Sequence, residues 1–412
     1  MTPAGSRYHA AIRPTVAACR TYTDREPPGQ TNCVTWRRPS PGTRERGGGE
    51  APAVGCRAGE RIALPTLPTL TSRALLIDVV SVSTGRMTAL TERPLPPPGP
   101  DGVNPSRARP AVRALYARPA LTAGDLSAPL LILPDGHPGA GSLPGAVHLA
   151  DVRKTVVRWR EMGIRGVKAF AFGHDRDGAG AAASSADNLM VLAVSAAKAA
   201  APDLAVTTEV CGCSWTSSGE CVLRGSAGNI DLDATYRLMG EMAVRHAEAG
   251  ADVVSPTAML DGSVRTARAA LDDQGFHDVG VNPNLAIHTT LYGPFKALMA
   301  TDPVVGHRRG LQLEPGRAQR DTLVQARRWM AEGADSLTLQ PVMTAVDVLV
   351  RLRADQEAPL VAYSTSGEWP ALRKIGSEGM TEYVAMLRRA GADHVLTFAA
   401  EQVAVYLERN RG

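Results

Sequence analysis

Lysine, aromatic residues and long apolar runs are all scarce in this chain of 412 residues. Only five lysines occur, the first of them at Lys154, and aromatic residues make up 4% of the sequence. No apolar run approaches the roughly 20 residues that a membrane-spanning helix needs, and the N-terminus lacks the continuous apolar core of a secretory signal. We therefore expect a cytoplasmic protein that has no membrane partner and keeps its thiols reduced.

The charge is small and unevenly distributed along the chain. A net charge of +4 is too low to indicate a nucleic-acid partner by itself. The first 60 residues hold nine arginines and no lysine, but these arginines are not interleaved with aromatic residues on a folded frame. We therefore predict no nucleic-acid binding.

Residues 1–105 are rich in proline, glycine, arginine and threonine, and "RRPSPGTRERGGGEAPAVG" has no period of 2 or 3.6 residues. Such a composition buries too little apolar surface to offset chain entropy. We interpret it as a low-complexity, largely disordered arm, or as sequence upstream of a start at Met87. One apolar run, 73–82, is either a strand or an isolated patch. Irregularly spaced cysteines without a histidine pattern do not favour a zinc module here: Cys19, Cys33 and Cys56.

Residues 106–412 alternate short apolar runs with longer amphipathic stretches. Helical patterns such as 233–250 and 320–333 end in glycine followed by Ala-Asp, which indicates a helix stop before a strand. Eight runs separated by helices predict parallel βα units and favour a (β/α)8 TIM barrel. No G-x-G-x-x-G follows the first run, which argues against a dinucleotide site. The eight runs are 128–133, 166–172, 204–210, 252–256, 278–283, 336–341, 359–364 and 394–399.

The chemistry of such a barrel lies at the carboxyl ends of its strands. The third strand ends at Glu209 to Cys213, which places three of the six cysteines at the active end of the fold. The ends of the fourth to eighth strands carry Ser255, Asn282 with Asn284, Gln340, Ser366 and Phe398.

The stretch "EVCGCSWTSSGEC", residues 209–221, favours a metal site. Three thiolates on one loop, Cys211, Cys213 and Cys221, can hold zinc and leave the fourth tetrahedral position open, as in catalytic zinc sites. An inert or oxidisable cysteine cluster is a second interpretation. A disulfide is a third, which the reducing compartment disfavours.

The same stretch resembles the zinc-binding segment of the 5-aminolevulinate dehydratase (porphobilinogen synthase) family. "TLYGPFKAL", "GHRRGLQLEP", "VAYSTSGEW" and "RRAGADHVLTFAAEQVAVYL" resemble further motifs of that family, in the family's order, over roughly residues 106–410. The resemblance implies a lyase of TIM-barrel fold that condenses two 5-aminolevulinate molecules into porphobilinogen through two Schiff-base lysines. It also implies zinc on the three cysteines and a homo-oligomer, an octamer or a smaller even assembly.

Several site residues carry over from the resemblance. Ser366 of the "SGE" motif is implied to bind a substrate carboxylate, and Tyr292 is the tyrosine of "YGPF". Lys296 stands where the family has a substrate-binding arginine, and Glu209 replaces an aspartate next to the metal loop. The tyrosine of the last strand is Phe398 here. The next substrate-binding motif persists as Arg308 and Gln312.

Both Schiff-base lysines are absent. The resemblance places them at Gln340 of "LTLQPV" and at Ala286 of "VNPNLAIHTTLYGPF". An amide or a methyl group cannot form an imine. His288, with Asn282 and Asn284, occupies this region and is either a proton shuttle or a structural residue.

Two other lysines are the candidates for a relocated amine. Lys168 lies on the second strand and points either into the barrel or towards the helices, while Lys296 is a carboxylate anchor or an imine former. Lys154, Lys198 and Lys374 lie in helical stretches.

We therefore expect a diverged, zinc-dependent enzyme of secondary metabolism that condenses, dehydrates or cyclises 5-aminolevulinate or a related small amino or keto acid without an imine. Glu209 is the candidate acid or base, with Lys296, Tyr292 and His288 as further catalytic candidates. Gln340 and Asn282 join Ser366 as substrate-binding candidates. The alternative is an inactive homologue that binds a ligand or partners a true dehydratase.

Overall fold

The computed structural model describes residues 109–115, 120–304 and 311–410. The predicted N-terminal arm at 1–105, with its apolar run at 73–82, lies outside the described residues. A short helix α2, Pro110–Leu115, precedes the barrel. No helix in the described part of the chain is both long and apolar enough to cross a membrane.

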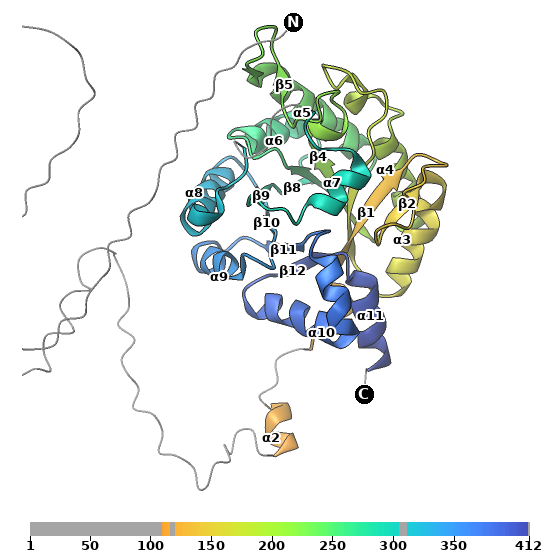
Figure 1. The fold of residues 1–412 in the computed structure, drawn as a ribbon, viewed down its shortest axis with the longest axis vertical. Coiled ribbons are helices and arrows are strands. Elements are labelled where there is room, and N and C mark those ends of the chain that lie inside the picture. Colours follow the sequence, from red (N-terminus) through yellow and green to blue (C-terminus); the bar gives the residue numbers. More distant parts are fainter. Residues whose placement is uncertain (1–108, 116–119, 305–310, 411–412) are drawn as a thin grey trace, which may run out of the picture. The chain divides into compact units, whose positions relative to one another are not determined.

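Parallel strands form the barrel predicted from the eight apolar runs (Figure 1). The hydrogen-bonded order is β8-β7-β4-β3-β1-β12-β11-β10-β9, and its two ends, β8 and β9, are successive pieces of one strand. A short β2, Ala146–His148, pairs with β1, and an antiparallel hairpin pairs β5, Leu223–Arg224, with β6, Ile230–Asp231. The barrel strands are β1 Leu126–Leu133, β3 Gly166–Ala171, β4 Ala205–Val210, β7 Val253–Pro256, β8 Gly280–Val281, β9 Asn284–Ala286, β10 Leu337–Gln340, β11 Leu360–Ser364 and β12 His394–Thr397.

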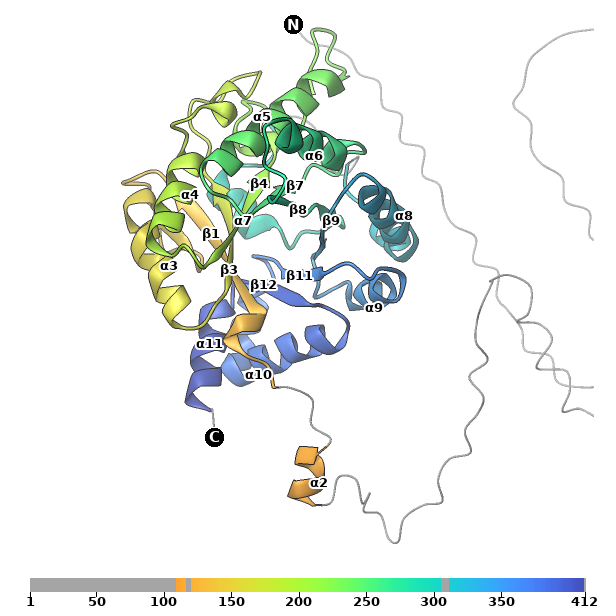
Figure 2. The same ribbon diagram turned by 180° about the vertical axis from the view of Figure 1, so that it is seen from behind.

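Helices lie outside the strands, as Figures 1 and 2 show from two sides. Because each strand has apolar residues on both faces, the core fills both the barrel interior and the layer between strands and helices. The predicted helices at 233–250 and 320–333 are α5 and α8. The helices are α3 Val152–Glu161, α4 Leu189–Ala200, α5 Leu232–Glu248, α6 Ser263–Asp273, α7 Gly293–Met299, α8 Ala318–Ala331, α9 Val346–Asp355, α10 Trp369–Arg389 and α11 Ala400–Arg409.

The fifth strand differs from its prediction. The run 278–283 was expected to end the strand at Pro283, with Asn282 and Asn284 at the carboxyl end. Instead β8 pairs with β7, the chain passes through Asn282 and Pro283, and β9 pairs with β10. Proline lacks a backbone N–H, so it interrupts the strand without ending it. Asn282 therefore lies below the carboxyl end, and Ala286 takes the place at the end.

A repeated Gly-Ala-Asp sequence joins three helices to their strands. Glycines 250, 333 and 391 have φ angles of 99°, 102° and 116°, the left-handed conformation that ends a helix. The aspartate that follows accepts a hydrogen bond from the backbone N–H of a neighbouring strand. Asp252 accepts from Val206 at 2.7 Å, Asp335 from Val281 at 2.7 Å and Asp393 from Leu360 at 2.8 Å.

Replacing Asp335 with alanine should lower the free energy of unfolding by about 1 kcal/mol, because the Val281 N–H loses its acceptor. Chemical denaturation measures this change. Asp278→Ala, at an exposed position near β8, is the control and should leave the midpoint unchanged. Equal midpoints for the two variants would contradict a strand-joining role for Asp335.

Candidate active site

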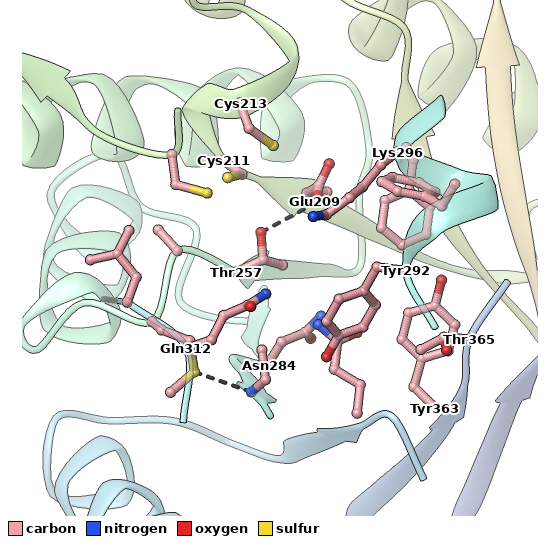
Figure 3. Close-up of a pocket in the computed structure, with 18 of the residues that line it drawn as sticks. Glu209, Cys211, Cys213, Thr257, Asn284, Tyr292, Lys296, Gln312, Tyr363 and Thr365 are labelled. Atoms are coloured by element: carbon pink, nitrogen blue, oxygen red, sulfur yellow. Dashed lines mark hydrogen bonds between the residues drawn. The ribbon is translucent and has the colours of Figure 1, made fainter. Parts of the chain in front are cut away.

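A pocket of about 690 Å³, including its open mouth, lies at the carboxyl ends of the strands (Figure 3). It brings together eleven of the residues singled out from the sequence: Glu209, Cys211, Cys213, Cys221, Asn284, Ala286, Tyr292, Lys296, Gln312, Gln340 and Ser366.

The three cysteines converge on one side of this pocket. Cys211 is the first residue after β4, and a 3-10 turn, Gly212–Ser214, carries Cys213. Thr216 donates a hydrogen bond to the Glu220 carbonyl at 2.9 Å, which turns the loop back to Cys221. The loop also needs Gly219, because its φ is 67° and a Cβ there would meet the Asp302 carbonyl oxygen at 2.4 Å. The three sulfurs lie within 4.8 Å of one another.

The donor set fits zinc. Sulfurs bound at about 2.3 Å to a tetrahedral zinc are separated by about 3.8 Å, so the observed cluster needs little adjustment. The cysteines are free thiols and are buried. Hydrogen bonds with Cys213 and Cys221, together with burial, raise the pKa of Cys211 well above its ordinary value. Three buried thiols side by side cannot all ionise without a cation, and a divalent metal would supply one.

Glu209 lines the same pocket as the cysteine cluster. It is part of β4, two residues before Cys211, and its side chain is nearly buried. Thr257, beyond the end of β7, donates a hydrogen bond to its carboxylate at 3.3 Å (Figure 3). A carboxylate beside a metal loop in a buried pocket has the position that proton transfer requires.

The opposite side of the pocket is built around α7. Tyr292, just before α7, donates a hydrogen bond to the Ile287 carbonyl at 2.9 Å, and burial raises its pKa well above the ordinary value. Ser366 accepts from the Phe295 N–H at 2.9 Å. Lys296 forms an ion pair with Asp302 at 2.9 Å. A bound anion would therefore share the Lys296 ammonium group with the Asp302 carboxylate.

Gln340 and Ala286, where the resemblance places two lysines, are partners in register between β10 and β9. Both line the pocket. This wall therefore presents an amide and a methyl group side by side.

Two of the residues predicted from the sequence lie outside the pocket lining. His288 lies in a different surface cavity and hydrogen-bonds to Gln312 at 3.0 Å, so it meets the pocket only through that amide. Asn282 lies in a cavity at the amino ends of the strands, where its amide pairs with Ser336 and Thr338. The sequence placed Asn282 at the active end because it predicted that the fifth strand ends at Pro283. Phe398 is buried in a core cluster, and Arg308 lies outside the described residues.

Lys168 points into the barrel, which the sequence left open. Its side chain is 3% exposed, and Nζ donates to Ser255 Oγ at 2.7 Å and to Asn284 Oδ1 at 2.6 Å. Burial lowers the pKa of Lys168 from 10.5 to about 7, against the opposing effect of the Glu209 charge. Every residue of β3 is buried, so alternation along the strand gave no signal for the direction of this side chain.

Comparison with known proteins identifies the family. The family model for delta-aminolevulinic acid dehydratase matches residues 103–406. The chain belongs to the delta-aminolevulinic acid dehydratase family. The dehydratase of Synechococcus elongatus is 31% identical over 321 residues, covering 73% of this chain and 97% of the relative. That of Escherichia coli is 30% identical over 310 residues, covering 72% and 95%.

A solved member of the dehydratase family has the same fold. The crystal structure of the enzyme from Toxoplasma gondii, in complex with its reaction product porphobilinogen, matches with a TM-score of 0.70 at 28% identity. The match covers 75% of this chain and 93% of that one. The match agrees with the barrel described above, so the TIM-barrel architecture predicted from the sequence is confirmed.

The buried amine makes stability depend on pH. Because the pKa of Lys168 is about 7 in the folded protein and 10.5 ordinarily, the unfolded chain binds more protons between these pH values, and stability rises with pH. Lys168→Met removes this penalty. Relative to the parent, the variant should gain about 3–5 kcal/mol more at pH 6 than at pH 10.

Thermal unfolding of both proteins across this pH range measures the difference. Lys154→Met, at an exposed lysine of α3, is the matched control and should follow the parent at every pH. A constant difference between Lys168→Met and the parent at all pH values would contradict a buried, destabilised ammonium.

Proposed function

We propose that this chain is a zinc-dependent, porphobilinogen-synthase-like enzyme of the lyase class. Its substrate is 5-aminolevulinate or a related small amino or keto acid, which it condenses, dehydrates or cyclises without an imine, in secondary metabolism. The observation that carries the proposal is the three-thiol cluster inside the pocket, beside Glu209. A family fold with an intact metal-donor set and no lysine at Gln340 or Ala286 favours altered chemistry over loss of function.

Cys211, Cys213 and Cys221 would hold the zinc. Zinc bound there supplies Lewis-acid chemistry, the polarisation of an oxygen or the acidification of a bound water. Glu209 exchanges a proton with the reacting centre, and Thr257 orients its carboxylate. Substrate carboxylate binds at Lys296, with Ser366 and Gln312 as neutral hydrogen-bonding groups in the same pocket.

The imine route is disfavoured by the lysines that the pocket contains. Lys296 is the one lysine that lines it among the described residues, and Asp302 holds its ammonium at 2.9 Å. This ion pair engages the amine nitrogen with a carboxylate oxygen, whereas imine formation needs that nitrogen free to attack a carbonyl carbon. Lys296 therefore suits the binding of a carboxylate.

A second candidate function is a non-catalytic homologue that binds a ligand or partners an active dehydratase. The methyl group of Ala286 beside Gln340 is the observation that favours it, because both replace reactive groups with unreactive ones. The cysteine cluster argues against a non-catalytic homologue, since a protein that catalyses no reaction does not require three buried thiols at its pocket.

Incubation of the zinc-quantified protein with 5-aminolevulinate, followed by mass spectrometry, tests the proposal. We expect one zinc per chain and a product that requires it. Cys213→Ser should lose the zinc and lower turnover by at least about 100-fold, because a ligand of the metal is lost. Ser195→Ala, outside the pocket on α4, is the control and should keep both.

The identity of the product distinguishes the candidates. A zinc-dependent product other than porphobilinogen supports the proposal in full, whereas porphobilinogen itself would contradict the altered chemistry. Turnover that survives in Cys213→Ser would contradict the role of the metal. Bound zinc without conversion of 5-aminolevulinate or any related acid would favour the non-catalytic homologue.

A further inference from the structure

A buried hydrogen-bond network lies directly beneath the pocket. Lys168 of β3 reaches across the barrel interior to Ser255 of β7 and Asn284 of β9. Lys168 does not line the pocket itself, but Asn284 does. The network therefore links the barrel centre to the pocket floor through one amide, labelled in Figure 3.

Chemistry fixes the orientation of that amide. An ammonium group has donors and no acceptor, so the atom of Asn284 that faces Lys168 at 2.6 Å is the carbonyl oxygen. The hydroxyl hydrogen of Ser255 goes to the nearer acceptor, the Asn282 carbonyl at 2.5 Å. Asn284 Nδ2 consequently points away from Lys168. Within the described residues, no group accepts a hydrogen bond from it.

Asn284 itself lines the pocket, so a ligand oxygen there can accept a hydrogen bond from this amide nitrogen. The surroundings select the kind of oxygen. Ala286, two residues further along β9, contributes only a methyl group, and its backbone N–H is directed at the sulfur of Met259. The amide of Asn284 is uncharged and suits an uncharged carbonyl oxygen, whereas the ammonium of Lys296 suits a carboxylate.

We propose that the Asn284 amide donates a hydrogen bond to the keto oxygen of the substrate, and that Lys168 is the positioning residue that fixes this amide. The inference rests on the proposed function, because it takes a small keto acid as the substrate. It adds a carbonyl-binding group on β9, next to the position where the resemblance places a lysine. The charge on Lys168 strengthens the donor, since a hydrogen bond to the amide oxygen polarises the amide group.

Two acids of similar shape isolate the keto oxygen. Levulinate carries the keto group and pentanoate carries a methylene in its place, so the ratio of their dissociation constants reports on carbonyl recognition alone. Calorimetric titration of the zinc-loaded parent, below the pKa of Lys168, should give a ratio of about tenfold in favour of levulinate.

Two variants test the two residues. Asn284→Asp keeps the size and the acceptor facing Lys168, replaces the donor with an oxygen and adds a negative charge that acts on the carboxylates of both acids alike. Lys168→Met releases the amide from its fixed orientation. Both should reduce the ratio to below about threefold, and Lys168→Met should change the affinity for pentanoate by less than about twofold. Lys198→Met is the matched control, since Lys198 pairs with Asp252 outside the pocket, and should keep the parent's ratio.

Each of the other possible outcomes contradicts one part of the proposal. Equal affinities of the parent for the two acids, or an unchanged ratio in Asn284→Asp, would remove Asn284 from carbonyl binding and leave the proposed function intact. A ratio lost in Asn284→Asp but kept in Lys168→Met would remove the positioning role of Lys168. Affinities for both acids that fall together in Lys168→Met would reduce the network to a structural role. No binding of either acid by the parent would contradict the proposed substrate class, and this inference with it.

Discussion

Closure of the barrel at Asn282 and Pro283 is the constraint on which the site depends. Strand β8 before this step pairs with β7, and strand β9 after it pairs with β10, so two residues join the ends of the sheet. Parallel strands in a closed barrel direct alternate side chains inward and gather their carboxyl ends at one rim. Glu209 and Gln340 meet at the pocket for this reason, although they are far apart in the sequence.

The interior has a polarity that is unusual for a barrel core. Lys168, Ser255 and Asn284 occupy positions where branched apolar residues commonly fill TIM barrels. A buried amine costs stability, and its low pKa expresses that cost. The cost is offset in part by two hydrogen bonds and by the charge of Glu209 nearby. Proteins retain such destabilising buried groups chiefly at functional sites, and Lys168 lies below the pocket that holds the cysteine cluster.

Much of this fold follows from local sequence signals. The eight apolar runs correspond to the strands of the barrel. Each Gly-Ala-Asp sequence ends a helix, because glycine adopts the left-handed conformation there more easily than other residues. The cysteines also converge as their spacing predicted, since a short loop cannot separate them far. The family resemblance located Tyr292 and Ser366 in the pocket, which local patterns could not do.

The remaining features depend on tertiary structure. The fifth strand continues beyond a proline because a partner strand lies on each side of it, and no local pattern contains those partners. The direction of Lys168 was open because β3 is buried on both faces. The network of Lys168 with Ser255 and Asn284 joins three strands and is defined only once the barrel closes.

The central claim is a metal-assisted reaction without an imine, and borohydride trapping tests it most directly. Reduction of the zinc-loaded protein in the presence of 5-aminolevulinate converts any imine into a stable secondary amine, which peptide mass spectrometry assigns to a residue. The account predicts no substrate adduct on any of the five lysines. A reduced adduct on Lys168 or Lys296 would contradict it, because one of these amines would then serve in place of the lysines absent at Ala286 and Gln340.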